Sequence, residues 1–307
     1  MFGTPNCTIV PKEVASDAGI AGEGVLLSFI VTAGLALVMS ATLVLQEFRQ
    51  STKPSTIRRK LINGYSDQQI IVGIGIQSVG LAKVDTLVPY HFFIIWMLSL
   101  LSMATHNATL LTLVRDFRRD WVLRWLRQFL MFVNLVLSCV YGVFVLQSKI
   151  KGLPNTLPIG CVWTLPDSNS SGVGSFLDYI GTIITIAGNC VVFGLATWYL
   201  HSREQRFYKI IQLVGMILMA SIAIGATIRV LLLSQAFGNP DVALGDQGEK
   251  SWSFGQVLSI LMLILPGISA VEILRGEIEV TPLPEDSFMQ PLFEGQLLDN
   301  PKIINRY

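Results

Sequence analysis

Seven long apolar runs dominate this chain of 307 residues. Each run is long enough to cross the hydrocarbon core of a bilayer, which is ~30 Å thick and needs ~20 residues of helix. The runs lie at 24–46, 67–86, 89–114, 128–147, 176–200, 208–233 and 254–274. The pattern predicts an all-α, polytopic membrane protein, with one seven-helix transmembrane bundle at 1–275. We expect the acidic, proline-containing stretch at 276–307 to be a disordered cytosolic tail.

The overall composition favours the same class of protein. Hydrophobic residues make up 51% and charged residues 14%, where a soluble protein carries roughly 25% charged residues. The formal net charge of +1 argues against a nucleic-acid partner, so the expected partners are the lipid bilayer and an apolar small molecule. The four cysteines form no CxxC pair, and we expect neither a metal site nor a cofactor.

The basic residues predict the orientation of the bundle. They concentrate after the first, third and fifth runs: Arg49, Lys53, Arg58, Arg59, Lys60; Arg115, Arg118, Arg119, Arg124, Arg127; Arg203, Arg206, Lys209. Because basic loops stay in the cytosol, we expect an N-terminus that is outside or lumenal and a cytosolic C-terminus, in the endoplasmic reticulum or plasma membrane. Two glycosylation sequons, at Asn6 and Asn169, lie on the predicted outer side. Cys7 and Cys161 share that side, as a disulfide or as two unpaired thiols.

Ionisable residues within the runs are the first candidates for a functional site. Glu23, Asp85 and His91 lie near the outer ends of different runs, and could hold a proton, a cation or a polar ligand head together. The alternative is that residues this close to the ends reach into water. Asp67 opens the second run, where a carboxylate also suits the helix dipole.

Polar groups also occur deeper in the runs. His106 lies ~12 Å from the basic end of the third run, and Gln77 lies at a comparable depth in the second. We expect both to line an interior cavity; the alternative is that they join helices through hydrogen bonds. Arg229 could bind an anionic head or pair with a carboxylate.

Several motifs resemble those of a large group of fungal seven-span membrane proteins. They are AGIAGEGVLLSF before the first run, SDQQ at the start of the second, and PYHFFIIWMLSLLS and ATHNATLLTLVRDFRRD in the third. The positions that match are Asp67, Gln68, Tyr90, His91, His106, Arg115 and Asp116. The chain departs from the group by carrying AGIAGEG where an Asp-containing motif is expected, and Glu23 could take its place.

Similar seven-span proteins in fungal natural-product clusters are membrane-bound terpene cyclases that act on epoxidised prenyl aromatics. The resemblance implies a metal-independent enzyme of secondary metabolism that protonates a terminal epoxide. Glu23 or Asp85 would supply the acid and His91 would orient it, with His106 and Asp67 as further catalytic candidates. Tyr90, Phe92 and Trp96 would line an aromatic cage, and Gln77 and Arg229 would complete the substrate site. The alternative is a seven-transmembrane receptor or sensor of a small molecule, and a transporter is a third class.

Overall fold

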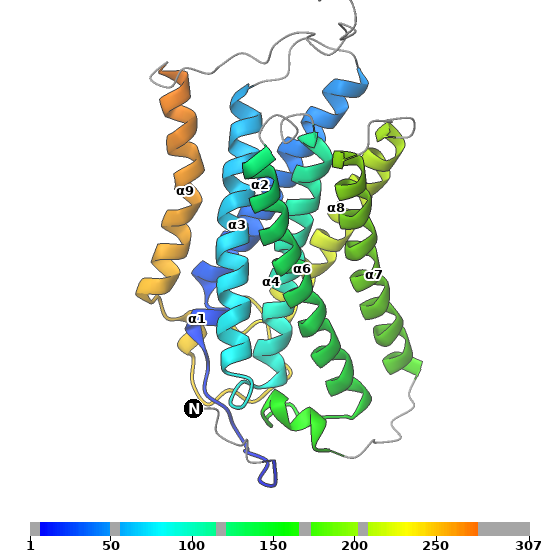
Figure 1. Ribbon diagram of the computed structural model, residues 1–307. Coiled ribbons are helices and arrows are strands. Elements are labelled where there is room, and N and C mark those ends of the chain that lie inside the picture. The colour runs from blue at the N-terminus through cyan, green and yellow to red at the C-terminus, as the bar shows by residue number, and fades with distance from the viewer. Residues whose placement is uncertain (1–6, 50–55, 115–120, 166–172, 202–207, 276–307) are drawn as a thin grey trace, which may run out of the picture.

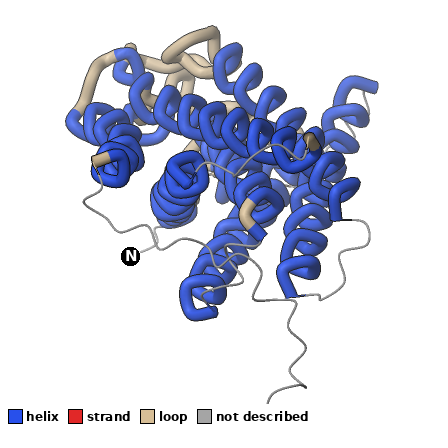
Figure 2. The backbone as a smooth tube through the Cα atoms, turned by 90° about the horizontal axis from the view of Figure 1, so that it is seen from above, coloured by secondary structure: helices blue, strands red, loops and turns tan. Residues whose placement is uncertain are grey.

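The computed structural model describes residues 7–49, 56–114, 121–165, 173–201 and 208–275. These residues form helices and loops without a strand, so the all-α prediction is confirmed (Figures 1 and 2). The long helices are α2 (Glu23–Phe48), α3 (Thr56–Ala82), α4 (Pro89–Thr112), α6 (Trp121–Ile150), α7 (Val173–His201), α8 (Tyr208–Leu233) and α9 (Phe254–Leu274). The short elements are α1 (Ala18–Ala21) and the 3-10 turns η1 (Ile159–Trp163) and η2 (Gly248–Lys250).

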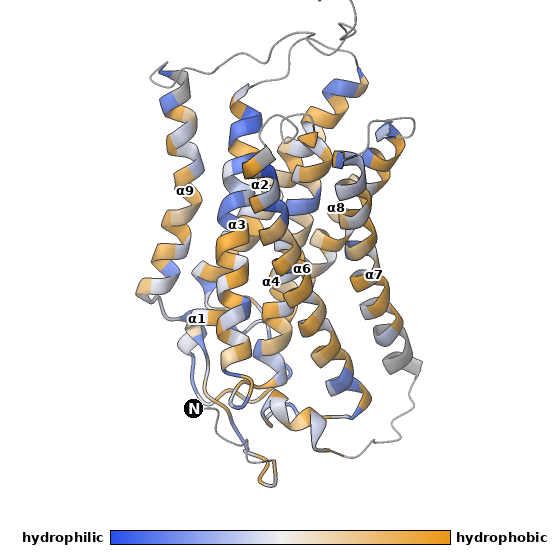
Figure 3. Ribbon diagram, viewed as in Figure 1, coloured by the Kyte–Doolittle hydropathy of each residue, from blue (hydrophilic) through white to orange (hydrophobic). Residues whose placement is uncertain are grey.

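Six of the long helices, all except α3, are long and apolar enough to cross a membrane, which is consistent with a multi-pass membrane protein. α3 begins at Thr56, well before the predicted start of the second run at 67, and its first turns read TIRRKLINGYS. These polar turns, followed by Asp67, Gln68 and Gln69, make α3 less apolar than its neighbours. The peripheral helices carry large apolar side chains that point away from the bundle, such as Trp198, Ile224 and Phe254. Figure 3 shows hydrophobic colour along these helices. That outward-facing apolar surface is the arrangement expected of helices in lipid.

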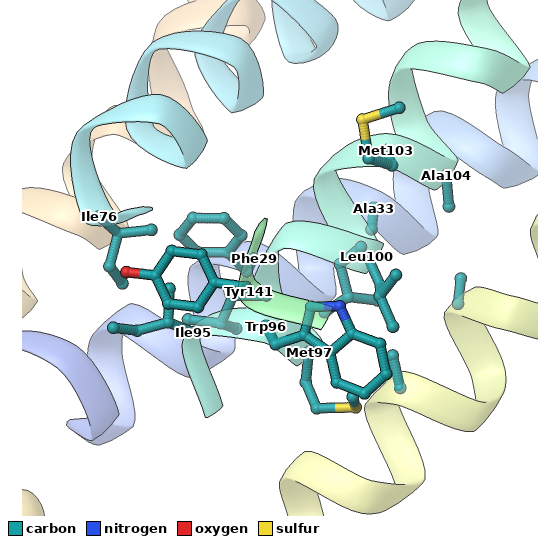
Figure 4. Packing of buried hydrophobic residues seen from close by; sticks show 14 of the residues in the cluster. Phe29, Ala33, Ile76, Ile95, Trp96, Met97, Leu100, Met103, Ala104 and Tyr141 are labelled. Carbon is teal, nitrogen blue, oxygen red and sulfur yellow. The ribbon is translucent and has the colours of Figure 1, made fainter. Parts of the chain in front are cut away.

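α4 is the central helix of the bundle. It packs against α1, α2, α3, α6, α7 and α8, and its whole apolar stretch is buried. Small and hydroxyl side chains such as Ser99, Ser102 and Ala104 let the neighbouring backbones come close. Figure 4 shows the core beside it, where Tyr141 of α6 lies next to Ile76 and Ile95.

Tyr141 explains why α3 carries glycine at position 80. The Tyr141 hydroxyl donates a hydrogen bond to the Gln77 carbonyl (2.7 Å), and its ring stacks on Phe92 at 4.1 Å. A Cβ atom added at Gly80 would lie 2.1 Å from the Tyr141 hydroxyl oxygen. The close approach of α3, α4 and α6 therefore depends on the missing side chain.

One end of the bundle is tied together by the N-terminal segment. We call it the disulfide end; it comprises residues 7–17, 83–88, 151–165 and 234–253. Cys7 and Cys161 form a disulfide, which settles the alternatives that the sequence left open. Val14 donates its N–H to Ala243 (3.0 Å) and accepts from Gly245 (2.9 Å). We call the opposite end of the bundle, where α2, α4 and α7 end and α3, α6 and α8 begin, the arginine end.

α9 stands at the edge of the bundle and packs on α2 and α3 (Figure 1). Near the disulfide end, the Gln256 side-chain oxygen accepts a hydrogen bond from the Gly24 N–H (3.1 Å). Further along, a Cβ at Gly64 of α3 would lie 3.0 Å from the ring of Pro266. Two close approaches therefore hold α9 to its neighbours.

Candidate functional site

A buried acid–base pair lies at the disulfide end. His91 Nε2 lies 2.9 Å from Glu249 Oε1, and the Tyr90 hydroxyl donates a hydrogen bond to Glu249 Oε2 (2.7 Å). His91 is 2% exposed and Glu249 is fully buried. The backbone N–H of Gln235 donates to the Tyr90 oxygen (2.9 Å). Both carboxylate oxygens therefore have partners, as a buried charge requires.

Local sequence explains how these groups meet. Pro89 occupies the first turn of α4, where its missing N–H breaks no helical hydrogen bond, so Tyr90 and His91 also fall in the first turn. Glu249 is the middle residue of η2, in the loop between α8 and α9. This loop folds back over the start of α4, and the N-terminal segment holds it there through Val14.

A cavity of about 380 Å³ adjoins the pair, between α4, α6, α8 and two loops. Its volume falls within the ~300–1,000 Å³ typical of small-molecule sites. The apolar lining residues are Pro89, Tyr90, Phe93, Val145, Leu153, Leu233 and Val242. The other lining residues are Ser148, Lys149, Gly152, Asn155, Arg229 and Asp241. Arg229, Asn155 and Asp241 are exposed, so the cavity communicates with the outside of the protein.

The lining of this cavity is both apolar and cationic. Lys149 and Arg229 carry positive charge against the single carboxylate of Asp241. A guanidinium offers a planar set of donors to a carboxylate or phosphate. The cavity can therefore accept a molecule with an anionic head and an apolar body.

Tyr90 connects the cavity to the buried pair. Its ring lines the cavity, while its hydroxyl contacts Glu249, which contacts His91 in turn. Tyr90 and Phe93 are three residues apart on α4, so they present one helical face to the cavity. A ligand there would contact the outermost group of a hydrogen-bonded chain that leads into the protein.

The predicted aromatic cage is only partly present. Tyr90 and Arg229 both line the cavity, as a shared site would require. Phe92 and Trp96 do not line it: Phe92 stacks on Tyr141, and Trp96 is 2% exposed in the core. Phe93, which the sequence analysis did not single out, faces the cavity in their place.

The structure does not bring the predicted acids to the cavity. Glu23 begins α2 and Asp85 lies in the turn between α3 and α4; both are half-buried at the disulfide end, and neither lines the cavity. Asp67 lies toward the arginine end, where it forms an ion pair with Arg127 of α6. Of the five predicted catalytic residues, His91 alone contacts the Tyr90–Glu249 group.

His106 and Gln77 belong to a buried polar seam between α3, α4 and α6. The imidazole of His106 lies 3.3 Å from Ser66 Oγ through Nδ1 and 3.1 Å from Ser102 Oγ through Nε2. Asn134 Nδ2 also reaches Ser102 Oγ (3.4 Å), and the Gln77 amide donates to the Asn134 oxygen. Neither His106 nor Gln77 lines the cavity beside Tyr90.

The hydrogen bonds of the seam assign the proton on His106. Ser102 donates its hydroxyl proton to the Gln69 carbonyl (3.0 Å), so it can only accept from the imidazole. Nε2 then carries the hydrogen, and Nδ1 accepts from Ser66. The network therefore suits a neutral imidazole that joins helices and does not suit an imidazolium acid.

Glu249, Lys149, Asn155 and Asp241 were missed by sequence reasoning. All four lie at or beyond helix ends, where charged and amide residues are ordinary. Glu249 is 158 residues from His91, and a loop carboxylate carries no local sign that it will be buried. Asn6, Asn169, Arg115 and Asp116, named as glycosylation or family positions, lie outside the described residues.

Comparison with known proteins adds no assignment. No protein-family model, curated protein or solved structure matches this chain.

Proposed function

We propose that this protein is a seven-helix membrane receptor or sensor that binds an amphipathic anion in the cavity at the disulfide end. The observation that carries the proposal is the cavity itself, which combines an apolar wall with Arg229 and Lys149 and opens to the outside. The anionic head would contact the two cations, and the apolar body would pack on Tyr90 and Phe93.

The position of the cavity supports a sensing role. It touches α4, which packs against most of the other long helices, and α8, which packs most extensively on α4. A ligand that contacts α6 and α8 together favours the spacing of these helices that fits it best. Because the Tyr90 hydroxyl is bonded to Glu249, a ligand that moves Tyr90 would also move the loop between α8 and α9.

We also propose that α3 crosses the membrane as the seventh span. α3 lies among α2, α4, α6 and α9, so its polar groups have protein partners instead of lipid. Its 27 residues correspond to ~40 Å of helix, which is longer than a bilayer core. With the disulfide end outside or lumenal, glycosylation is expected at Asn6 and Asn169; modification at neither, with a cytosolic N-terminus, would overturn this orientation.

The second candidate function is a proton-initiated cyclase like the fungal membrane-bound terpene cyclases. The observation that favours it is Tyr90, a residue of the cavity lining whose hydroxyl is hydrogen-bonded to Glu249, which contacts His91 in turn. For Tyr90 to pass its proton to an epoxide, its O–H would have to turn from Glu249 to the ligand, and the resulting phenolate would then need a proton from Glu249 or His91. The exposed residues of the lining favour the receptor, because a carbocation must be shielded from water.

Binding of dodecyl phosphate to the purified full chain tests the receptor proposal. Arg229→Gln should weaken binding about tenfold, which corresponds to about 1.4 kcal/mol, because a charge-assisted contact to the head is lost. Arg275→Gln, an exposed arginine at the opposite end of the bundle, is the matched control and should bind like the parent protein. Equal binding by both variants, or equal binding of dodecyltrimethylammonium by the parent protein, would refute the cationic site.

An activity assay separates the two functions. Membranes containing the protein are incubated with an epoxidised prenyl aromatic, and cyclised product is measured for the parent protein, Tyr90→Phe and Glu249→Gln. Turnover by the parent that both substitutions abolish would establish the cyclase. If the parent protein binds dodecyl phosphate but forms no cyclised product, the result supports the receptor and contradicts the cyclase.

A further inference from the structure

A second cavity, of about 320 Å³, lies on the other side of the bundle, between α1, α2, α3 and α9. It shares no lining residue with the candidate site. Ile20, Val25, Val72, Ile76 and Val79 form its apolar lining. Glycines at 19, 75 and 255 and Ser259 complete most of the wall. It is therefore an apolar groove within helices of membrane-crossing length.

The two close approaches of α9 explain why the groove exists. α9 is held to α2 by the Gln256–Gly24 hydrogen bond and approaches α3 closely where Gly64 meets Pro266. Beside the Gln256 contact, glycine replaces a side chain on both helices: a Cβ at Gly75 would meet nothing within 4 Å, and one at Gly255 only an atom 4.0 Å away. The gap between α3 and α9 is thus left unfilled.

The groove opens sideways, toward the surroundings of the helices. Gly75 and Val79 of α3 and Gly255 of α9 are exposed, whereas Val25 and Ile76 at the back are buried. With α3 crossing the membrane as proposed above, an opening between α3 and α9 faces the acyl chains of the bilayer. A molecule that enters there comes from the lipid phase.

An ion pair marks the end of the groove that is nearest to the loops. Lys83 Nζ lies 2.7 Å from Asp17 Oδ2, and both residues line the cavity. The Lys83 side chain is 46% exposed and that of Asp17 is 23% exposed, so both can reach a ligand. Opposite charges side by side match a head that carries both a phosphate and an ammonium group.

We propose that this groove binds one zwitterionic phospholipid from the leaflet at the disulfide end. One acyl chain lies along Val25, Ile76 and Val79 and fills the space that Gly75 and Gly255 leave. The phosphate contacts Lys83 and the ammonium group contacts Asp17. The bound lipid then closes the gap between α3 and α9.

Native mass spectrometry of the purified full chain with palmitoyl-oleoyl phosphatidylcholine tests this site. The parent protein should retain one lipid molecule, and Gly75→Leu should lower the retained fraction at least tenfold because leucine fills the groove. Gly255→Leu blocks the groove from α9 and should act in the same way. Gly225→Leu on α8, where a Cβ also meets nothing within 4 Å, is the matched control and should retain the lipid.

The head is tested separately with phosphatidylglycerol, which has the phosphate but no ammonium group. The parent protein should retain it several-fold less than phosphatidylcholine, and Asp17→Asn should remove that difference. Loss of the lipid in Gly225→Leu as well as in Gly75→Leu, or retention in both groove variants, would overturn the site. Equal retention of the two lipids by the parent protein would overturn the assignment of a zwitterionic head.

Discussion

At the scale of single residues, substitution of Glu249 is expected to have the largest effect on stability. It is fully buried between His91 and Tyr90, so Glu249→Ala leaves the buried His91 ring and the half-buried Tyr90 hydroxyl without this partner. We expect a loss of about 3–5 kcal/mol in the free energy of unfolding, because breaking one side of a buried pair strands the other. Asp85→Ala, at a half-buried carboxylate of the same end, should change stability by less than about 0.5 kcal/mol.

Unfolding in detergent, followed by circular dichroism, measures both effects. Replacing both members of the pair, as His91→Leu with Glu249→Leu, should recover part of the loss, since no stranded charge remains. The account would be contradicted by a double variant whose loss in the free energy of unfolding exceeds the losses of His91→Leu and Glu249→Leu added together.

Asp246 predicts a pH dependence for the N-terminal segment. Hydrogen bonds from the Ser16 side chain and the Gly248 N–H hold the pKa of Asp246 below its ordinary value of 3.8. The stabilisation is therefore present above that value and is lost as the pH falls through the lower pKa of the folded state. Hydrogen exchange at the Gly245 amide, which bonds to Val14, should show protection that is constant above pH 3.8 and falls below it. An equal change in Asp246→Asn would show that another group is responsible.

At the scale of elements, two glycines of α3 have opposite roles. Gly80→Ala should be strongly destabilising, because its Cβ would fall 2.1 Å from the Tyr141 oxygen and force α3 away from α6. Gly75→Ala is the matched control: its Cβ meets open space, and alanine is the better helix former by about 1 kcal/mol. The change in the midpoint of thermal unfolding, relative to the parent protein, should be negative for Gly80→Ala and positive for Gly75→Ala. A similar loss in both variants would mean that α3 is not packed as described.

The contact between α6 and α7 can be tested through two thiols. Cys139 Sγ lies 3.8 Å from Cys190 Sγ. Copper-phenanthroline oxidation in membranes should cross-link them, since the thiols are near enough to meet after a small movement. Mass spectrometry after digestion would detect the linked peptides, and Cys190→Ser is the control that must lose them. Failure to cross-link in the folded parent protein would contradict the placement of α7.

At the scale of the whole molecule, the disulfide joins segments 154 residues apart. Cys7→Ser with Cys161→Ser should lower the free energy of unfolding by about 2–5 kcal/mol, because the unfolded chain regains freedom. The loop that carries Glu249 should loosen as well, since the N-terminal segment holds it through Val14. Thermal unfolding with and without reductant measures the loss, and Cys139→Ser is the control. A parent protein that is insensitive to reductant would contradict the prediction.

The existence of the helices was predictable because length and hydropathy are properties of adjacent residues, but not all of their limits were: α6 begins at Trp121 where the sequence predicted 128. α8 and α9 have the predicted bounds, whereas α3 extends further because its first turns are polar but helix-forming. The site was less predictable, because it depends on contacts between distant segments. His91 could be singled out as an ionisable residue in an apolar run, but its partner Glu249 lies in an ordinary polar loop. Phe92 and Phe93 are adjacent, and only the rotation of α4 decides which one faces the cavity.

The complete enclosure of α4 has a consequence for how this chain is made. Ribosomes deliver α4 before α6, α7 and α8, which supply much of its cover. At that stage Ser66 of α3 can already bond to His106, but Asn134 of α6 has not been synthesised. Because histidine and asparagine in the middle of a helix are costly in lipid, we expect α4 to stay in the translocon or beside α2 and α3 until the later helices arrive. Biogenesis, more than the finished fold, is the stage at which substitutions on α4 should be least tolerated.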